Sequence, residues 1–331
     1  MINITQEQVM EKWGVKNSDT PLLSIECMTY NHEKYISQAL DGFLMQKTTF
    51  PFEIIVHDDA STDSTANIIR EYEKKFPLII KPIYQTENQW SKHDGSISRI
   101  LCSQFKGKYI ASCEGDDYWI DSEKLQKQVT FLEQNPDYVM CYSKAKKYLQ
   151  STNQYLNKSF GNSLCEFEQL LYRGNCIPTL TTCYKKDLYF KYRREIVPEN
   201  KHWSMGDYPL WLFISMNSKI KFFDTEMSVY RVLQESASHF KNVQDQLKFN
   251  KSYYEIKKFF ADLNNLNMPN WNEQQELFNI YYYRLIDNFN KNDRNGLAEI
   301  YKRMERKTFR EVIIYILSRT KLTFKLLGLR K

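Results

Sequence analysis

The sequence contains little glycine and proline, only 10 and 9 of its 331 residues. This scarcity excludes collagen-like and low-complexity chains. No run of 18 apolar residues occurs, so we expect no membrane-spanning helix. The polar segment 1–14 has neither the basic nor the apolar region of a secretory signal. With 42% hydrophobic and 26% charged residues, the composition is that of a folded protein, and the length indicates two domains or one large domain with an appendix.

The seven cysteines are odd in number and form no C-x-x-C pair. Most of them stand among apolar residues, which is typical of reduced, buried thiols in the cytoplasm. His32 and His57 are not spaced with any cysteine as zinc ligands are, so we expect no zinc site.

The net charge of +6 is concentrated at the C-terminal end. Residues 301–331 contain ten basic and two acidic residues, and the rest of the chain is slightly acidic. The basicity is therefore a property of one segment. It does not indicate a nucleic-acid-binding surface, and we expect no nucleic-acid partner.

Short apolar segments alternate with amphipathic ones over the first 150 residues. Strands are expected at 22–29, 52–57, 78–84 and 108–113, with helices at 32–46, near 68–76 and at 96–105. This alternation predicts an α/β fold, with a mostly parallel sheet covered by helices on both faces.

The remainder of the chain is less regular up to residue 240 and then helical. We expect strands at 178–183 and 219–223, a helix at 207–215, and further helices at 241–263, 272–290, 295–306 and 308–327. The pattern predicts a first domain over residues 1–240 and an all-helical C-terminal region over 241–331.

Acidic and polar residues follow three of the expected strands: TYNHE at 29–33, DD at 58–59 and EGDD at 114–117. Because ligands bind beyond the carboxyl ends of parallel strands, these residues should share one edge of the sheet. Without a cation such a cluster would repel itself. Carboxylate oxygens suit Mg²⁺ or Mn²⁺, which can neutralise a bound diphosphate.

Each motif also has a purely structural interpretation. EGDD can be a solvated acidic turn, Asp59 can cap a helix, and Tyr30 can be a core tyrosine. Alternatively, a carboxylate at the end of the second strand can accept hydrogen bonds from a base imide or a ribose hydroxyl, and Tyr30 can stack on a nucleobase.

The three motifs, in this order and spacing, resemble the family 2 glycosyltransferases of the GT-A fold over about residues 20–240. The resemblance implies a nucleotide-sugar site and a divalent metal, Mn²⁺ or Mg²⁺, held by Asp116. Glu114 stands where that family usually has aspartate, and its longer side chain can still reach a ribose hydroxyl or metal-bound water. The nucleotide-sugar-binding residues implied by position are Thr29, Tyr30, Glu33, Asp59, Glu114, Asp117 and Arg231.

The family also supplies a catalytic base at the start of a later helix, and Asp207 in MGDYPLW matches it. Such a carboxylate removes a proton from the attacking sugar hydroxyl. A helix-capping role for Asp207 is compatible with this. Arg231 in YRV resembles a segment that contacts the diphosphate, although Leu233 stands where the family has histidine; His239 is a substitute or a surface residue. Trp203 either packs or stacks on an acceptor sugar.

These residues predict an inverting glycosyltransferase that moves a sugar from a nucleotide-sugar, with UDP expected as the carrier. The acceptor would be a glycan or a lipid-linked saccharide in bacterial surface-polysaccharide assembly. The alternative is an inactive nucleotide-sugar-binding or scaffold subunit, which loss of Asp116, Asp117 or Asp207 would favour; all three are present. A nucleotidyltransferase would need a glycine-rich loop after the first strand, and TYNHEKY contains no glycine.

The expected helix at 308–327 has an apolar stripe beside basic residues. This pattern is typical of an amphipathic helix on an anionic membrane surface, which would make the enzyme peripheral on the inner face of the membrane. The alternative is a helix packed on the segment 241–306. The stripe comprises Phe309, Val312, Ile313, Ile316, Thr323, Phe324 and Leu327, and the basic residues beside it are Lys307, Arg310, Lys321 and Lys325.

Overall fold

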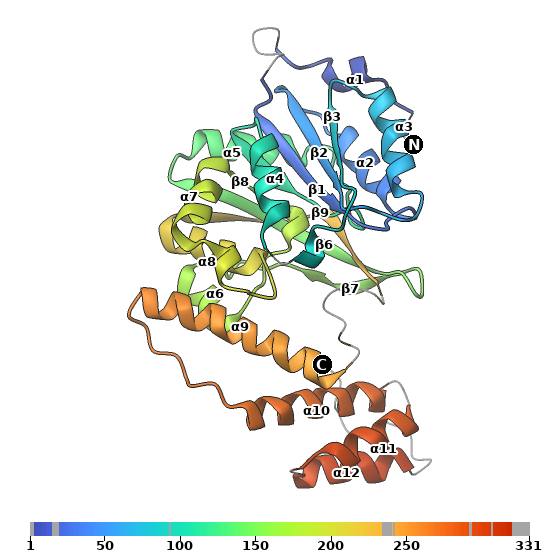
Figure 1. The fold of residues 1–331 in the computed structure, drawn as a ribbon, viewed down its shortest axis with the longest axis vertical. Coiled ribbons are helices and arrows are strands. Elements are labelled where there is room, and N and C mark those ends of the chain that lie inside the picture. Colours follow the sequence, from blue (N-terminus) through green and yellow to red (C-terminus); the bar gives the residue numbers. More distant parts are fainter. Residues whose placement is uncertain are drawn as a thin grey trace. The chain divides into compact units, whose positions relative to one another are not determined.

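The structure is a computed structural model with two compact units, Met1–Ser236 and Ala237–Lys331 (Figure 1). Each unit is described by itself. The residues described are 3–14, 20–92, 94–233, 240, 242–290, 293–305 and 307–319.

One sheet, nine-stranded over the described residues, forms the centre of the first unit, in the order β3-β2-β1-β4-β8-β6-β9-β5 with β7 paired to β6. Strands β3, β2, β1 and β4 run parallel, as do β6 and β9, and the other pairs are antiparallel. The strands are β1 (Leu23–Thr29), β2 (Phe52–Asp58), β3 (Ile80–Tyr84), β4 (Tyr109–Ser112), β5 (Tyr118–Trp119), β6 (Tyr138–Leu149), β7 (Gln154–Phe160), β8 (Cys183–Lys185) and β9 (Lys219–Val232).

Helices cover both faces of this sheet, as the alternating sequence predicts (Figure 1). On one face, α2, α3 and α5 pack on the alternate residues Leu23, Ile25 and Cys27 of β1, all of them fully buried. The helices of this unit are α1 (Gln6–Met10), α2 (Ile36–Leu44), α3 (Thr65–Lys75), α4 (Ser96–Gln104), α5 (Lys124–Gln134), α6 (Phe167–Arg173), α7 (Lys186–Ile196) and α8 (Asp207–Asn217), with 3-10 turns η1 (Trp90–Lys92), η2 (Thr179–Thr181) and η3 (Pro198–Asn200).

The parallel register brings the polar strand ends together. Thr29, the last residue of β1, pairs with Asp58 at the end of β2. Beyond β4, the amide of Gly115 donates to the Met28 carbonyl at 2.9 Å, so the EGDD turn continues alongside β1. The expected convergence of these segments at the carboxyl edge is therefore a direct result of strand pairing.

The region between 138 and 232 differs most from the sequence-based expectation. The strand expected at 178–183 is instead η2 followed by the short β8. The sequence pattern missed the β6–β7 hairpin and the full length of β9. β7 is mostly exposed and the second half of β6 is rich in lysine, so only the first residues of β6 form an apolar run.

The second unit contains four described helices: α9 (Val243–Leu263), α10 (Glu273–Asn290), α11 (Arg294–Arg303) and α12 (Phe309–Arg319). No helix among the described residues is long and apolar enough to cross a membrane. Leu285, Leu297, Met304 and Ile314 form a buried cluster that joins α10, α11 and α12.

Helix α12 packs through a different face from the apolar stripe expected there. Ile314 is 1% exposed, and the Tyr315 ring stacks on Tyr301 with centroids 4.0 Å apart. By contrast, Ile316 of the stripe is 54% exposed. Thr323, Phe324, Leu327, Lys321 and Lys325 lie outside the described residues.

Two truncated chains test whether α12, and not the segment after it, stabilises the second unit. A chain ending at Arg319 should unfold like the full chain, because it keeps Ile314 and Tyr315. A chain ending at Lys307 should lose the cooperative melt of the second unit, because Leu285 and Met304 become exposed. Thermal unfolding followed by circular dichroism measures both, and identical melts for the two truncations would contradict the packing of α12.

Candidate active site

The EGDD turn is fastened to β9 by the buried side chain of Arg231, which is 5% exposed. Its Nε donates to the Asp116 carbonyl at 2.7 Å, and its backbone amide donates to Asp117 Oδ1 at 2.7 Å. The two terminal nitrogens donate to Gln38 and Gln150, each at 2.7 Å. Arg231 is expected at the diphosphate; in the structure each nitrogen of its guanidinium donates one hydrogen bond, and the bond from Nε holds the turn.

Carboxylates crowd this turn. Burial, and then the charge of Asp116, raise the pKa of Glu114 to about 8, and Asp207 contributes to the same shift. Burial also raises the pKa of Asp117, with Asp116 and Glu114 adding to it. Asp207 therefore lies close enough to Glu114 to repel it, although the two are far apart in the sequence.

The end of β1 lies directly beneath the turn. A Cβ on Gly115 would lie 2.7 Å from Thr29 Oγ1 and 3.0 Å from His32 Nδ1, so only glycine allows this approach. Both of these atoms are buried and lack a hydrogen-bond partner among the described residues. Burial lowers the pKa of His32, while the charge of Asp116 opposes that shift.

The expected nucleobase acid, Asp59, is 4% exposed and both of its carboxylate oxygens are engaged. Oδ1 accepts the Gln89 amide at 2.7 Å and Oδ2 accepts the Trp90 amide at 3.0 Å. Asp59 thus fixes the turn η1. The ring of Trp90 on that turn is 58% exposed, and Tyr30 on the neighbouring β1 loop is 44% exposed.

The loop after β1 is tied to the loop after β2. Glu33 accepts the Ser64 amide at 3.0 Å, ahead of α3. Asn31, whose φ is +55°, accepts the Thr62 amide at 2.8 Å. In this arrangement Glu33 stabilises the loop pair, while the Tyr30 ring is left exposed beside it.

Asp207 is the first residue of α8, and Gly206 is its N-cap. Its Oδ2 accepts hydrogen bonds from Asn175 at 3.2 Å and from the Thr179 hydroxyl at 3.1 Å. Burial raises its pKa above the ordinary value of 3.8, and these hydrogen bonds oppose the shift. A carboxylate held in this way and raised in basicity can accept a proton from a hydroxyl.

The acids of the turn provide hard oxygen ligands of the type that Mg²⁺ and Mn²⁺ prefer. However, no three His, Cys, Asp or Glu side chains of the described part are grouped to hold a metal ion by themselves. The residues fit a cation that takes its remaining ligands from a bound diphosphate and water, as Mg²⁺ commonly does.

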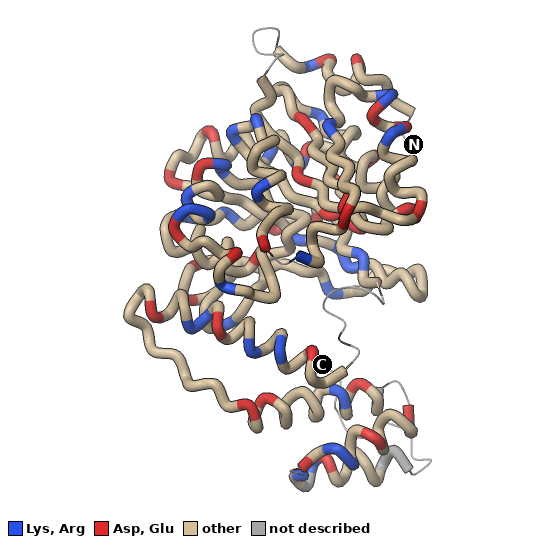
Figure 2. The backbone as a smooth tube through the Cα atoms, in the orientation of Figure 1, with Lys and Arg blue, Asp and Glu red and all other residues tan. Residues whose placement is uncertain are grey.

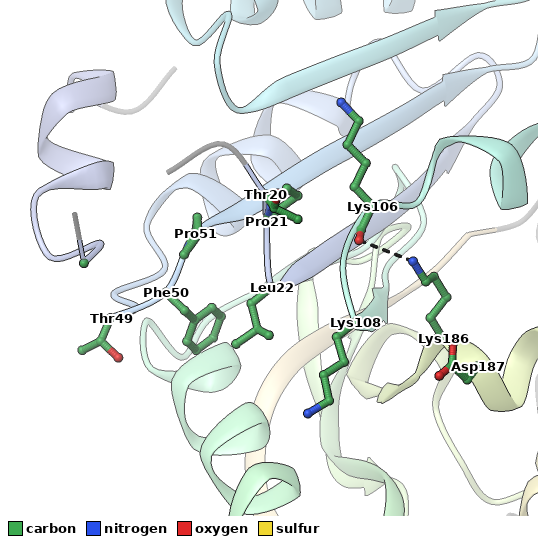
Figure 3. Close-up of a pocket in the computed structure, with 11 residues that line it drawn as sticks. Thr20, Pro21, Leu22, Thr49, Phe50, Pro51, Lys106, Lys108, Lys186 and Asp187 are labelled. Atoms are coloured by element: carbon green, nitrogen blue, oxygen red, sulfur yellow. Dashed lines mark hydrogen bonds between the residues drawn. The ribbon is translucent and has the colours of Figure 1, made fainter. Parts of the chain in front are cut away.

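A cavity of about 920 Å³ lies elsewhere in the first unit (Figure 3). Its lining includes Leu22, Pro51 and Lys108, which precede the parallel strands, so it lies at the opposite edge of the sheet from the acids. Gly14 and Thr20 also border it, and the residues between them are outside the described part. We draw no functional argument from this cavity.

Several residues that hold the acids in place had no signal in the sequence. Gln38, Gln150, Asn175 and Thr179 are isolated polar residues that only the tertiary fold brings to Arg231 and Asp207. An isolated glutamine or threonine is common on any surface, so its position in the sequence does not indicate this role.

Relatives of known sequence match part of this chain. An uncharacterised protein of Mycobacterium tuberculosis is 44% identical over 120 residues, which is 36% of this chain and 34% of that protein. The poly(ribitol-phosphate) β-N-acetylglucosaminyltransferase TarS of Staphylococcus aureus is 33% identical over 115 residues, 34% of this chain and 19% of TarS. The matched part therefore spans about a third or less of these relatives.

Solved structures show the same fold at low sequence identity. TarS residues 1–349 in complex with UDP-GlcNAc superpose with a TM-score of 0.54 and 20% identity, covering 89% of this chain and 79% of that one. The mannosyltransferase PcManGT of Pyrobaculum calidifontis, solved with GDP-Man and Mn²⁺, gives 0.51 and 14%, covering 94% and 85%. The fold is thus that of the GT-A glycosyltransferases.

The family model described as glycosyl transferase family 2 matches residues 24–199, which is more than half of the chain. This range contains all three acidic motifs at the carboxyl edge of the sheet. The chain belongs to glycosyl transferase family 2.

Proposed function

We propose that this protein is an inverting glycosyltransferase that uses a nucleotide-sugar, with UDP as the expected carrier, and glycosylates a hydroxyl group of a bacterial glycan or lipid-linked saccharide. The observation that carries the proposal is the family 2 match over residues 24–199, which contains the three acidic motifs at one edge of the sheet. Asp207, held by Asn175 and Thr179, lies near enough for its charge to raise the pKa of Glu114, after burial and Asp116. A base for the acceptor and acids for the donor thus share one site.

In the proposed reaction, Asp207 takes the proton of the acceptor hydroxyl. The oxygen forms a bond to C1 of the donor sugar while the bond from C1 to the diphosphate breaks, and its electron pair leaves with the nucleoside diphosphate. A single displacement of this kind inverts the configuration at C1. Asn175 and Thr179 orient the Asp207 carboxylate, and Arg231 holds the turn that faces the donor.

A divalent cation would be held by Asp116, with Glu114 reaching a ribose hydroxyl or metal-bound water, and when bound it would neutralise the charge of the diphosphate. We propose that Tyr30, exposed beside Asp59, faces the nucleobase. For Thr29, Glu33 and Asp59 the contacts favour a supporting role, in which they shape the loops around the nucleotide. The domain assignment, with transfer in residues 1–240 and a helical region beyond, is part of this proposal.

We also propose contact between the basic C-terminal segment and an anionic membrane surface. The chain ending at Arg319 tests this idea, because it lacks four of the basic residues that the segment carries. If it binds anionic vesicles like the full chain, the membrane contact is wrong. The rival function, an inactive scaffold subunit, is disfavoured because the folded chain brings Asp207 close to the acidic turn.

Replacing Asp116 by asparagine should abolish the metal-dependent part of nucleotide-sugar binding, because it removes a charged oxygen ligand. Calorimetric titration of UDP-GlcNAc, UDP-Glc and GDP-Man, with Mn²⁺ or with EDTA, measures this. Asp137→Asn is the matched control, since Asp137 is an exposed acid paired with Lys219. Equal binding in EDTA, or full binding by the Asp116 variant, would sink the metal assignment.

Replacing Asp207 by asparagine should lower kcat about 100- to 10,000-fold, the usual cost of losing a general base, while donor affinity stays unchanged. Asp187→Asn controls for helix effects, because Asp187 is also an acid in the first turn of a helix. Steady-state kinetics with the donor identified above separates kcat from KM. A large loss of donor affinity with kcat preserved would instead assign Asp207 to the donor site.

Replacing Glu114 by glutamine should stabilise the metal-free protein increasingly as pH rises. With its pKa raised to about 8, folded Glu114 keeps a proton that the unfolded chain releases near 4.5, so wild-type stability falls across this range. The gain in Tm should therefore grow from pH 5 to pH 8 and then level off.

Glu133→Gln is the control of opposite sign. The amine of Lys108 and the Tyr109 hydroxyl lower the pKa of Glu133, so its contribution to stability is present at neutral pH and is lost in acid. Melting curves of both variants from about pH 3 to pH 8 make the comparison. A Tm gain for the Glu114 variant that is constant with pH would refute the assigned charge state.

A further inference from the structure

The β6–β7 hairpin carries four lysines, of which two lie beside acidic residues and, among the described residues, two do not. On one face of β6, Lys144 forms an ion pair with Asp224, and Lys146 lies 3.6 Å from Glu226. On the other face are Lys147 and, on β7, Lys158. Within the described part of the chain, neither of these two forms an ion pair with an acidic residue. Figure 2 marks basic residues in blue and acidic residues in red along the backbone.

Lys147 is held in place without a counter-ion. Its amine lies 5.1 Å from the centre of the Phe160 ring, and the side chain is half-buried. Burial and the positive charge of Lys158 both lower the pKa of Lys147. Two ammonium groups that repel each other weaken the folded state, and an anion bound between them would reverse that effect.

A continuous series of contacts leads from this pair to the proposed base. The Phe160 ring packs edge-on against Tyr230 with centroids 5.8 Å apart. Gly161, the next residue, approaches Pro178 so closely that a Cβ would lie 3.2 Å from the proline ring. Pro178 precedes Thr179, whose hydroxyl donates to Asp207 at 3.1 Å.

We propose that Lys147 and Lys158 bind a phosphate group of the acceptor, which is a chain containing phosphodiester links whose reacting hydroxyl reaches Asp207. This inference rests on the proposed function and names the acceptor class for it. Lys147 pairs with Leu156, two residues before Lys158, so the two lysines are close neighbours across the hairpin. Phe160, which Lys147 contacts, precedes the glycine that packs on Pro178 just before η2.

A membrane surface is the less suitable occupant of this face. Electrostatic attachment to anionic lipids generally takes a cluster of about four to eight basic residues. This face offers two without acidic partners, enough for one phosphate of a chain. The geometry therefore favours a discrete phosphate over a lipid surface.

The test is equilibrium binding of a short synthetic ribitol-phosphate oligomer, compared with the same polyol chain without phosphate. The full chain should bind the charged oligomer more tightly than the neutral one. The double variant Lys147→Ala, Lys158→Ala should lose about ten-fold or more in affinity for the charged oligomer only, since each nearby charge contributes roughly a factor of five. Lys146→Ala is the matched control, and its affinity should not change.

Three results would overturn the inference: no preference of the full chain for the charged oligomer, equal affinity of the double variant and the full chain, or an equal loss with Lys146→Ala. Loss of binding to phosphatidylglycerol vesicles with oligomer binding retained would also overturn it, by assigning the face to a membrane. Binding of UDP by the double variant is measured in parallel and should be unchanged. Failure of the full chain to bind any nucleotide would instead contradict the proposed function and leave the oligomer result standing by itself.

Discussion

The guanidinium of Arg231 is the contact on which the acidic edge depends. It is buried, and it joins the carbonyl of Asp116 to Gln38 on α2 and to Gln150 after β6. A buried guanidinium must have its donors satisfied, and each of its three nitrogens donates a hydrogen bond. The four parallel strands β3, β2, β1 and β4, which lead into the turn, are thereby connected to β9 in the other part of the sheet. Pairing of β5 with β9 holds the residues that follow the turn, and the Arg231 side chain adds a direct bond to the turn itself.

The turn held in this way is electrostatically unfavourable by itself. Glu114 and Asp117 both have raised pKa values, and the charge of Asp116 contributes to each. A folded protein tolerates such repulsion where a bound ligand relieves it. The raised pKa values of these acids therefore indicate a ligand-binding site. A cation and a diphosphate together relieve the repulsion among these carboxylates better than either alone. The cation offsets the carboxylate charges, and the diphosphate supplies the remaining ligands of the cation.

The sequence predicted the parts of the molecule that local rules determine. Buried parallel strands are continuous apolar runs, and the residues after them must meet at one edge, so both the fold class and the acidic cluster followed from the chain before 120. The β6–β7 hairpin was missed because its lysines obscure any alternation, and its stability comes from pairing with β9. The hydrogen-bond partners of Asp207 could not be predicted from the sequence either, since nothing local distinguishes Asn175 or Thr179 from other polar residues.

The predictable residues are those proposed to bind the donor, and the unpredictable ones are those proposed to bind the acceptor. The donor side is built from strand ends of the parallel sheet, where topology leaves little freedom. The acceptor side is built from η2, the start of α8 and an exposed hairpin, whose side chains can change without disturbing the strands beneath them. Lys144 is paired with Asp224, whereas Lys147 has no acidic partner in the described part of the chain, and both side chains are half-buried. Under this proposal, exchanging a few hairpin charges would alter the choice of acceptor, while the contacts of Arg231 keep the donor edge constrained.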